Sequence, residues 1–152
     1  MNKYDTIIIR ARALIVDNGH ILLTKHQNDP TKTYSFLPGG KVEFGEHARD
    51  TLIRELQEEL GVITTIKRFL GTGEGIWNKD SRTQHDICLY FEVTCPKLVS
   101  TQTPPPCKED DIEFLWQPIS KLKEAEFVPP YAQQSIDNWL IGRYEQFLSD
   151  FN

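Results

Sequence analysis

Residues 40–62, GKVEFGEHARDTLIRELQEELGV, decide the fold, because their charged and apolar side chains divide onto two faces of one helix. At about 100° per residue, with Arg54 as the origin, Glu58 lies at roughly 40°, Glu55 at roughly 100° and Glu59 at roughly 140°. The arc from roughly 160° to 260° holds the apolar residues Leu52, Ile53, Leu56 and Leu60. The pattern predicts a helix with one core face and one face that carries three carboxylates.

Three carboxylates on one face weaken an isolated helix, since like charges three or four residues apart repel by a few tenths of a kcal/mol. A divalent cation bound among them would remove that repulsion. An ordinary solvated face is the alternative interpretation, and the neighbouring residues argue against it. Gly39 and Gly40 form a turn just upstream, and Gly61 follows the helix where a left-handed cap belongs.

This segment resembles the Nudix box, which reads Gly, five residues, Glu, seven residues, then Arg-Glu-apolar-any-Glu-Glu-any-Gly-apolar. The residues that meet its defined positions are Gly40, Glu46, Arg54, Glu55, Leu56, Glu58, Glu59, Gly61 and Val62. His47 and Thr51 depart from common choices in the family, but neither change removes a charge. The chain is identified as a member of the Nudix hydrolase family, MutT-like in type. The resemblance implies an α/β fold, an α/β/α sandwich with a mixed β-sheet.

The resemblance also implies a reaction. Family members cleave the pyrophosphate bond of a nucleoside diphosphate linked to another moiety, with Mg²⁺ or sometimes Mn²⁺, and oxygen ligands suit such hard cations. The implied metal ligands are Gly39 through its carbonyl, Glu55, Glu58 and Glu59, and the implied catalytic residues are Arg54, Glu55, Glu58, Glu59 and Glu46. The general base stays open between Glu55, which we favour, and a distal acid among Glu109, Asp110 and Asp111.

Candidates for substrate binding are Gly40 and Lys41 beside the box and three side chains that can stack on or bond a base, Trp77, His85 and Tyr131. Packing against the sheet is the alternative role for these three rings. The segment around Tyr131 and Ala132 resembles the base-reading segment of the oxidised-dGTP branch but lacks its Asn. We therefore expect broad hydrolysis with weak base discrimination, and specificity that resides between residues 71 and 85 and around Tyr131.

Two other classes of function share the fold. A nucleotide-sensing, non-catalytic binding module usually loses box glutamates, whereas this chain keeps all of them. An isomerase of isoprenoid diphosphates uses additional Cys and Glu residues in a longer chain. Both classes are therefore disfavoured, and the first is retained as the main alternative.

The composition is that of one ordinary globular domain over residues 1–152, with 26% charged and 39% hydrophobic residues. A net charge of −5 argues against a nucleic-acid partner. No segment is long and apolar enough to span a bilayer, so we expect a cytoplasmic protein without a membrane partner. The expected partner is a small-molecule nucleotide, with a homodimer left open. Three cysteines without a C-x-x-C spacing disfavour a zinc site or a disulfide framework.

Around the box, the sequence predicts a hairpin from 7–16 to 21–26 that turns at Asp17-Asn18-Gly19, and further strands at 34–37, 63–71, 86–93 and 112–117. Glycines at 71, 73 and 75 predict a flexible substrate loop, and prolines predict a surface loop at 95–107. Ser120 is expected to cap a short helix. A C-terminal amphipathic helix is predicted from the spacing of Ile136, Trp139, Leu140, Tyr144, Phe147 and Leu148.

Overall fold

The computed structural model describes residues 6–26, 31, 34–79, 82–108, 111–143 and 147–149. Its strands are β1 (Ile7–Leu14), β2 (Val16–Asp17), β3 (His20–His26), β4 (Ser35–Phe36), β5 (Gly39–Lys41), β6 (Thr65–Lys79), β7 (Arg82–Thr94), β8 (Ile112–Pro118) and β9 (Phe147–Ser149). Its helices are α1 (Ala48–Leu60), the 3-10 helix η1 (Ile119–Glu124) and α2 (Pro130–Leu140).

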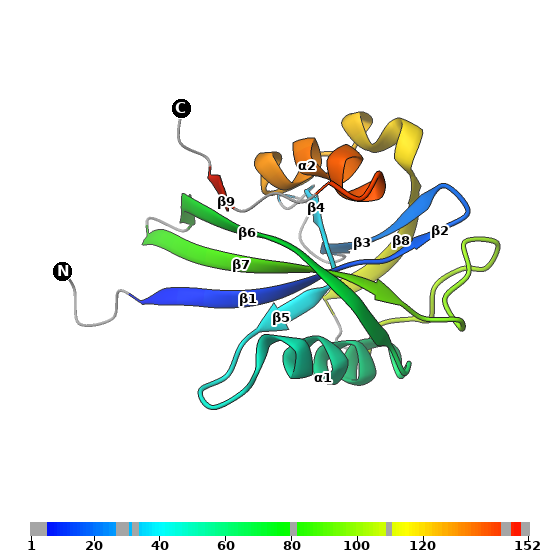
Figure 1. Cartoon of the computed structure of the whole chain (residues 1–152), viewed down its shortest axis with the longest axis horizontal. Coiled ribbons are helices and arrows are strands. Elements are labelled where there is room, and N and C mark those ends of the chain that lie inside the picture. The colour runs from blue at the N-terminus through cyan, green and yellow to red at the C-terminus, as the bar shows by residue number, and fades with distance from the viewer. Residues whose placement is uncertain are drawn as a thin grey trace.

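Within the described residues the strands form two sheets, shown in Figure 1. The larger sheet has five strands in the order β5-β1-β7-β6-β9, and it is mixed because β1 runs parallel to β7 and antiparallel to β5. The second sheet contains β2, β3 and β4, with β8 antiparallel to β3. Helix α1 lies on one side of the sheets and α2 on the other. The α/β sandwich with a mixed sheet is confirmed, and the second sheet is an addition to the prediction.

Buried side chains gather on both faces of the larger sheet. Ala11 and Ala13 of β1 belong to the cluster that includes Leu52 and Leu56 of α1. Leu14, on the opposite face of the same strand, belongs to the cluster that includes Tyr131, Ile136 and Trp139 of α2. Because successive residues of a strand point to opposite faces, odd-numbered residues of β1 face α1 and even-numbered residues face α2. This alternation determines which of the candidate site residues can contact one another.

Helix α1 packs with a small rotation relative to the sequence prediction. Its end is as predicted, because Gly61 has φ 68° and its N–H donates to the Gln57 carbonyl at 3.0 Å. Ile53, predicted in the core, is 43% exposed, whereas Glu59 is only 5% exposed. The buried arc therefore extends from the leucines toward Glu59. The sequence wheel could not show this, because the neighbouring strands decide how far the helix turns.

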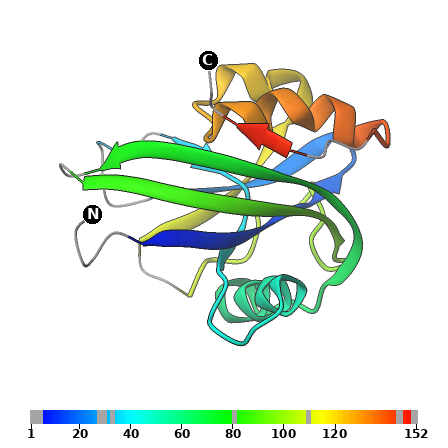
Figure 2. The same cartoon turned by 60° about the vertical axis from the view of Figure 1, so that its left-hand side comes forward.

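The glycine-rich segment that we expected to be a flexible loop is instead strand. β6 pairs with β7 from Thr65↔Thr94 to Lys79↔Arg82, which forms the long hairpin in Figure 2. Glycine suits this strand because the side chain of Tyr131, from α2, packs directly over it. A Cβ atom built on Gly73 would lie 2.3 Å from Cε2 of Tyr131, so the ring packs directly on the backbone.

The predicted C-terminal helix is wrong beyond residue 140. Helix α2 ends at Leu140, and Gly142 follows with φ 79°, a conformation that interrupts the helical path. Residues Phe147–Ser149 form β9, which runs parallel to β6 with Phe147 opposite Thr72. Tyr144 lies outside the described residues. Helical spacing alone misassigned this segment, because it did not register the break at Gly142.

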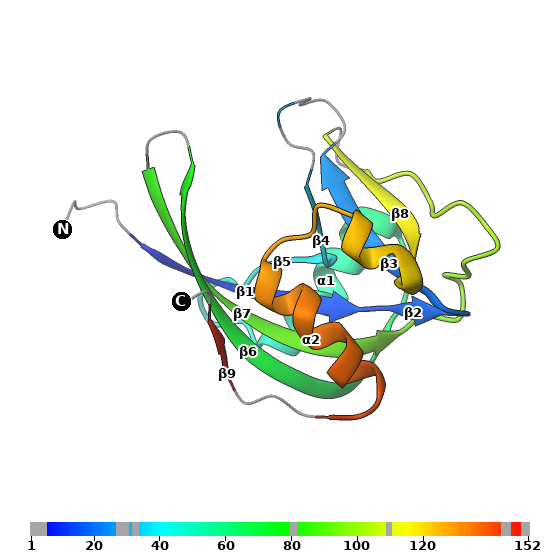
Figure 3. The same ribbon diagram turned by 90° about the horizontal axis from the view of Figure 1, so that it is seen from above.

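The N-terminal hairpin is shorter than predicted. Asn18 and Gly19 have φ values of 44° and 74° and join β2 to β3, as the Asp-Asn-Gly signal indicated. β1, however, belongs to the larger sheet, while β3 lies beside β8 in the smaller one, as the view from above shows (Figure 3). The short helix after β8 begins at Ile119 with Pro118 as its N-cap, so Ser120 does not cap it.

Gly73→Ala should lower the free energy of unfolding by about 1–3 kcal/mol, because the new methyl group cannot share its space with the Tyr131 ring. Chemical denaturation provides the measurement. The same substitution in a Tyr131→Ala background should cost clearly less, since the clashing ring is then absent. Equal losses in both backgrounds would show that the Tyr131 contact is not the cause.

Candidate functional site

Arg12 holds the glycine turn before α1 in place. Its Nη1 donates to the carbonyls of Leu37 at 3.1 Å and Gly39 at 2.9 Å. Gly39 has φ 130°, and a Cβ there would lie 2.1 Å from the Ala11 carbonyl oxygen, so only glycine fits. Sequence reasoning missed Arg12. The strand alternation of β1 offered a signal, since its two arginines, Arg10 and Arg12, stand among apolar residues and require partners.

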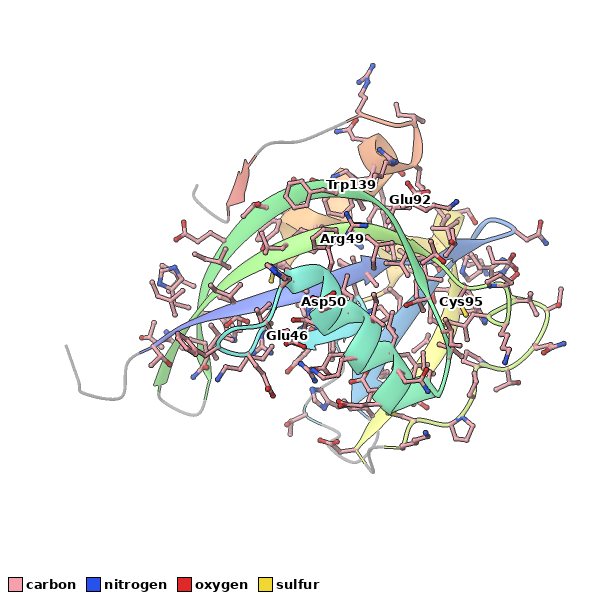
Figure 4. All side chains as sticks on the ribbon, turned by 60° about the horizontal axis from the view of Figure 1, so that its bottom comes forward. Glu46, Arg49, Asp50, Glu92, Cys95 and Trp139 are labelled. Carbon is pink, nitrogen blue, oxygen red and sulfur yellow. The ribbon has the colours of Figure 1, made fainter. Side chains whose placement is uncertain are left out.

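Arg54 binds three of the carboxylates implied by the box. Its Nε and Nη2 donate to the two oxygens of Glu46 at 2.8 and 3.0 Å. Its Nη1 donates to Glu55 Oε1 at 2.9 Å and to Glu58 Oε2 at 3.2 Å. Figure 4 shows Glu46 on the loop that leads into α1, so the guanidinium joins this loop to the helix face. The sequence placed these groups near one another, and the structure brings them into contact.

The three box glutamates differ in exposure. The Glu58 side chain is 59% exposed, that of Glu55 is 15% exposed, and residue Glu59 is 5% exposed. Glu55 packs against the glycine turn, because a Cβ on Gly40 would lie 2.2 Å from its carboxyl carbon. The missing side chain at Gly40 therefore leaves the space that the Glu55 carboxylate occupies. Glycine is required at this position for a packing reason.

The distal acids are only partly described. Glu109 and Asp110 lie outside the described residues. Asp111 Oδ2 lies 3.9 Å from His26 Nδ1, and its side chain is 65% exposed. Glu55 thus remains our proposed base.

The candidate substrate residues do not share one face. The pairing places His85 opposite Ile7 and Ile76, on the face toward α1, where its Nε2 lies 2.8 Å from Glu74 Oε1. Trp77 pairs with Gln84 and lies on the opposite face, toward α2. Tyr131 is 7% exposed, and its hydroxyl contacts that of Tyr90 at 3.2 Å. Trp77 and Tyr131 therefore flank the same face, and His85 does not.

The phosphate-side candidates lie beside the box. Lys41 is exposed at the end of β5, where it pairs with Arg10 of β1. Its carbonyl accepts from Arg54 Nη2 at 3.4 Å. Gly40 pairs with Ala11, on the face toward α1. Sequence reasoning missed the neighbour of Lys41, Arg10, which forms an ion pair with the buried Asp86 of β7.

The family model for the NUDIX domain matches residues 8–137. The chain belongs to the NUDIX domain family. It is a Nudix pyrophosphohydrolase. One relative is similar to it over most of the sequence. This relative, the Low-salt glycan biosynthesis protein Agl8 of Haloferax volcanii, is 32% identical over 139 residues, 86% of this chain and 80% of the relative.

Two further comparisons cover different extents of the Nudix chain. An ADP-ribose pyrophosphatase of Methanocaldococcus jannaschii is 43% identical over 58 residues, which are 38% of this chain and 34% of the relative. The solved MutT protein from Methanosarcina mazei Go1 is 23% identical, with a TM-score of 0.66 over 91% of this chain and 96% of that one. At this identity the solved structure establishes the fold alone.

The donor chemistry of the Nudix site fits a hard divalent cation, since it offers carboxylate and carbonyl oxygens. In the described part of the chain, no three His, Cys, Asp or Glu side chains converge closely enough to hold an ion. Arg54 instead lies among the carboxylates, bonded to both Glu55 and Glu58. The residues thus fit magnesium by the type of their donor atoms, and Arg54 adds one positive charge among them.

The stabilisation that Glu46 gains from its ion pair should be lost only in acid. The Arg54 hydrogen bond lowers the pKa of Glu46 from 4.5 to about 2. Because this folded-state pKa is depressed, its stabilisation is full above pH 4.5 and is lost as the pH falls from 4.5 to about 2. The difference in Tm between wild type and Glu46→Gln should shrink across that window. Glu43→Gln, an exposed neighbour, is the control. A constant difference through the window would contradict this assignment.

Proposed function

We propose that this Nudix pyrophosphohydrolase cleaves the P–O–P bridge of a nucleoside triphosphate or of a nucleoside diphosphate linked to another moiety. The observation that carries the proposal is the contact of Arg54 with Glu46, Glu55 and Glu58 beside the Gly39–Gly40 turn. On an ordinary solvent-exposed helix face, three carboxylates would not be expected to bind one guanidinium beside a turn that only glycine fits.

The metal in this proposal is Mg²⁺, with Mn²⁺ as a substitute, held by Glu55, Glu58, Glu59 and the Gly39 carbonyl. When bound, such an ion neutralises phosphate oxygens and acidifies a water molecule. The two contacts of Arg54 with Glu46 anchor the guanidinium. Its remaining contacts orient Glu55 and Glu58, because a charged hydrogen bond restricts the carboxylate's rotation.

Glu55 is the group that we assign to accept a proton from the attacking water. Its side chain is mostly buried, and Arg54 and Gly40 fix its position. Lys41, exposed at the neighbouring end of β5, supplies a cation that contacts a substrate phosphate. Trp77 is the ring we assign to the nucleoside, since it is 42% exposed, whereas Tyr131 is buried and acts by shaping the face.

The substrate class rests on chemistry shared by the relatives. One relative is named for ADP-ribose, which contains a nucleoside diphosphate, and the box accounts for that diphosphate part. Among the described residues, no helix combines the length and apolar character needed to cross a bilayer. A cytoplasmic location remains a prediction, and the question of a homodimer stays open.

The test is a substrate screen with product identification. Nucleoside triphosphates, ADP-ribose, nucleotide sugars and dinucleotides are incubated with the protein and Mg²⁺, and the products are separated by chromatography. Release of a nucleoside monophosphate with pyrophosphate, or with a second phosphate ester, supports the proposal. Tight binding of these nucleotides without any cleavage would instead favour the non-catalytic sensing module.

A further inference from the structure

The face of the larger sheet toward α2 gathers charged groups that the box chemistry does not use. Asp86 of β7 pairs with Ile8 of β1 on one side and with Gly75 of β6 on the other. Arg10 lies two residues along β1 on the same face, and its Nε donates to Asp86 Oδ2. Along this face β6 carries glycine at 71, 73 and 75, so the β6 residue paired with Asp86 contributes no side chain.

Asp86 is buried yet only half satisfied. The residue is 4% exposed, and Arg10 binds one of its two carboxylate oxygens. Among the residues that the structure describes, no donor reaches the other oxygen, Oδ1, which is itself buried. A buried acceptor without a donor costs about 1–3 kcal/mol, and native proteins seldom retain one without a reason. This oxygen therefore points to a ligand that brings an N–H or O–H group.

Trp77 supplies an aromatic surface next to this carboxylate. Trp77 lies two residues after Gly75 on β6, and Gly75 is the strand partner of Asp86. The side chains of Trp77 and Asp86 are therefore on the same face of the sheet. Trp77 is 42% exposed, which leaves part of the indole free to stack. An aromatic ring beside a carboxylate and a guanidinium is a combination that suits a planar ligand with polar edges, such as a nucleobase.

This surface is continuous with the phosphate side of the site. Arg10 pairs with Lys41 of β5, and Arg12, two residues further on β1, holds the Gly39 carbonyl. Asp86 pairs with Ile8, and Gly39 pairs with Arg12, four residues further along β1. With the two interstrand spacings between β7 and β5, the backbone separation is about 16 Å, which an extended nucleoside triphosphate can bridge. The residues that would contact base and phosphate thus lie on four adjacent strands, β5, β1, β7 and β6.

We propose that Asp86 Oδ1 accepts a hydrogen bond from the exocyclic amino group of the substrate's nucleobase, with Arg10 donating to the adjacent ring nitrogen and Trp77 stacking on the ring. An acceptor beside a donor complements the amino edge of cytosine or adenine. Uracil and hypoxanthine place a carbonyl oxygen where the amino group would be, and two acceptors repel. The inference rests on the proposed function. It replaces the expectation of weak base discrimination in general with weak discrimination only among bases that carry the amino group.

The test measures binding of product nucleotides without catalysis. Isothermal titration calorimetry of the full chain in EDTA compares CMP with UMP, and AMP with IMP. The amino nucleotide should bind roughly 10–100-fold more tightly in each pair, the range expected for one hydrogen bond to a charged group. Asp86→Asn, whose amide offers a donor as well as an acceptor, should reduce both ratios to below about threefold.

The matched control is Glu92→Gln. Glu92 lies on the same strand and also pairs with an arginine, Arg68, near α2 and away from Glu46 (Figure 4). This variant should keep the wild-type ratios. Should Asp86→Asn fail to fold, the binding ratios of the wild type still test the inference. Trp77→Ala should weaken the binding of both nucleotides in each pair equally.

The outcomes separate this inference from the proposed function. Equal binding of CMP and UMP, or of AMP and IMP, by the wild type would overturn the inference even if triphosphates are hydrolysed. A ratio between CMP and dCMP that Asp86→Asn abolishes, with equal CMP and UMP binding, would overturn it in favour of a sugar hydroxyl. Selective CMP binding without hydrolysis of any nucleotide would support the inference while refuting the enzyme proposal.

Discussion

Turnover of a nucleoside triphosphate by Glu58→Gln should fall at least about a hundredfold below that of the wild type, about 2.7 kcal/mol or more in the barrier. The substitution keeps the volume of the side chain and removes one negative charge that we assign to the metal. Glu58 is the most exposed of the three box glutamates, and its bond to Arg54 is the longer of the two that Nη1 donates. Its loss should therefore leave the folded protein largely intact.

Stability is the control for this variant. An exposed pair contributes about 0–1 kcal/mol, so the free energy of unfolding of Glu58→Gln without metal should stay within about 0.5 kcal/mol of the wild type. Asp50→Asn removes a carboxylate from the first turn of the same helix, outside the Arg54 cluster, and should keep its turnover. Near-normal turnover of Glu58→Gln would show that the acidic face of α1 is an ordinary solvent-exposed helix face.

Removal of divalent metal should abolish hydrolysis. Without a cation, the negative charges of the substrate meet those of Glu55, Glu58 and Glu59, and nothing lowers the pKa of the attacking water. Exhaustive dialysis against EDTA should leave no measurable turnover, and added Mg²⁺ should restore it. Activity that survives chelation would refute the metal assignment.

A second readout tests the ligands without relying on activity. A ligand that binds only the folded protein raises its Tm, so Mg²⁺ added to the metal-free wild type should raise the Tm. The rise should be smaller in Glu58→Gln and unchanged in Asp50→Asn. An equal rise in Glu58→Gln would place the metal away from the box helix.

Local patterns predicted the box helix and its partners correctly because those contacts are close in sequence. Glu58 lies four residues after Arg54, so the helical period brings these two together, and Glu46 lies only eight residues before Arg54, on the loop that enters the helix. The cap at Gly61 and the turn at Asn18-Gly19 were predictable for a similar reason, since each depends on the conformation of one or two residues. In contrast, Ile53 and Glu59 exchanged their expected exposures because the packing of β5 and β1 decides the rotation of α1.

The sequence by itself determined the family, the acidic helix face and the glycine turn, since these follow from spacing within about twenty residues. Only the tertiary structure decided that residues 71–79 form a strand, that His85 and Trp77 lie on opposite faces, and that Arg10 meets Asp86 across 76 positions. Strand register sets these relations, and a shift of one residue would reverse every face. The register depends on pairing between distant segments, which no local spacing encodes.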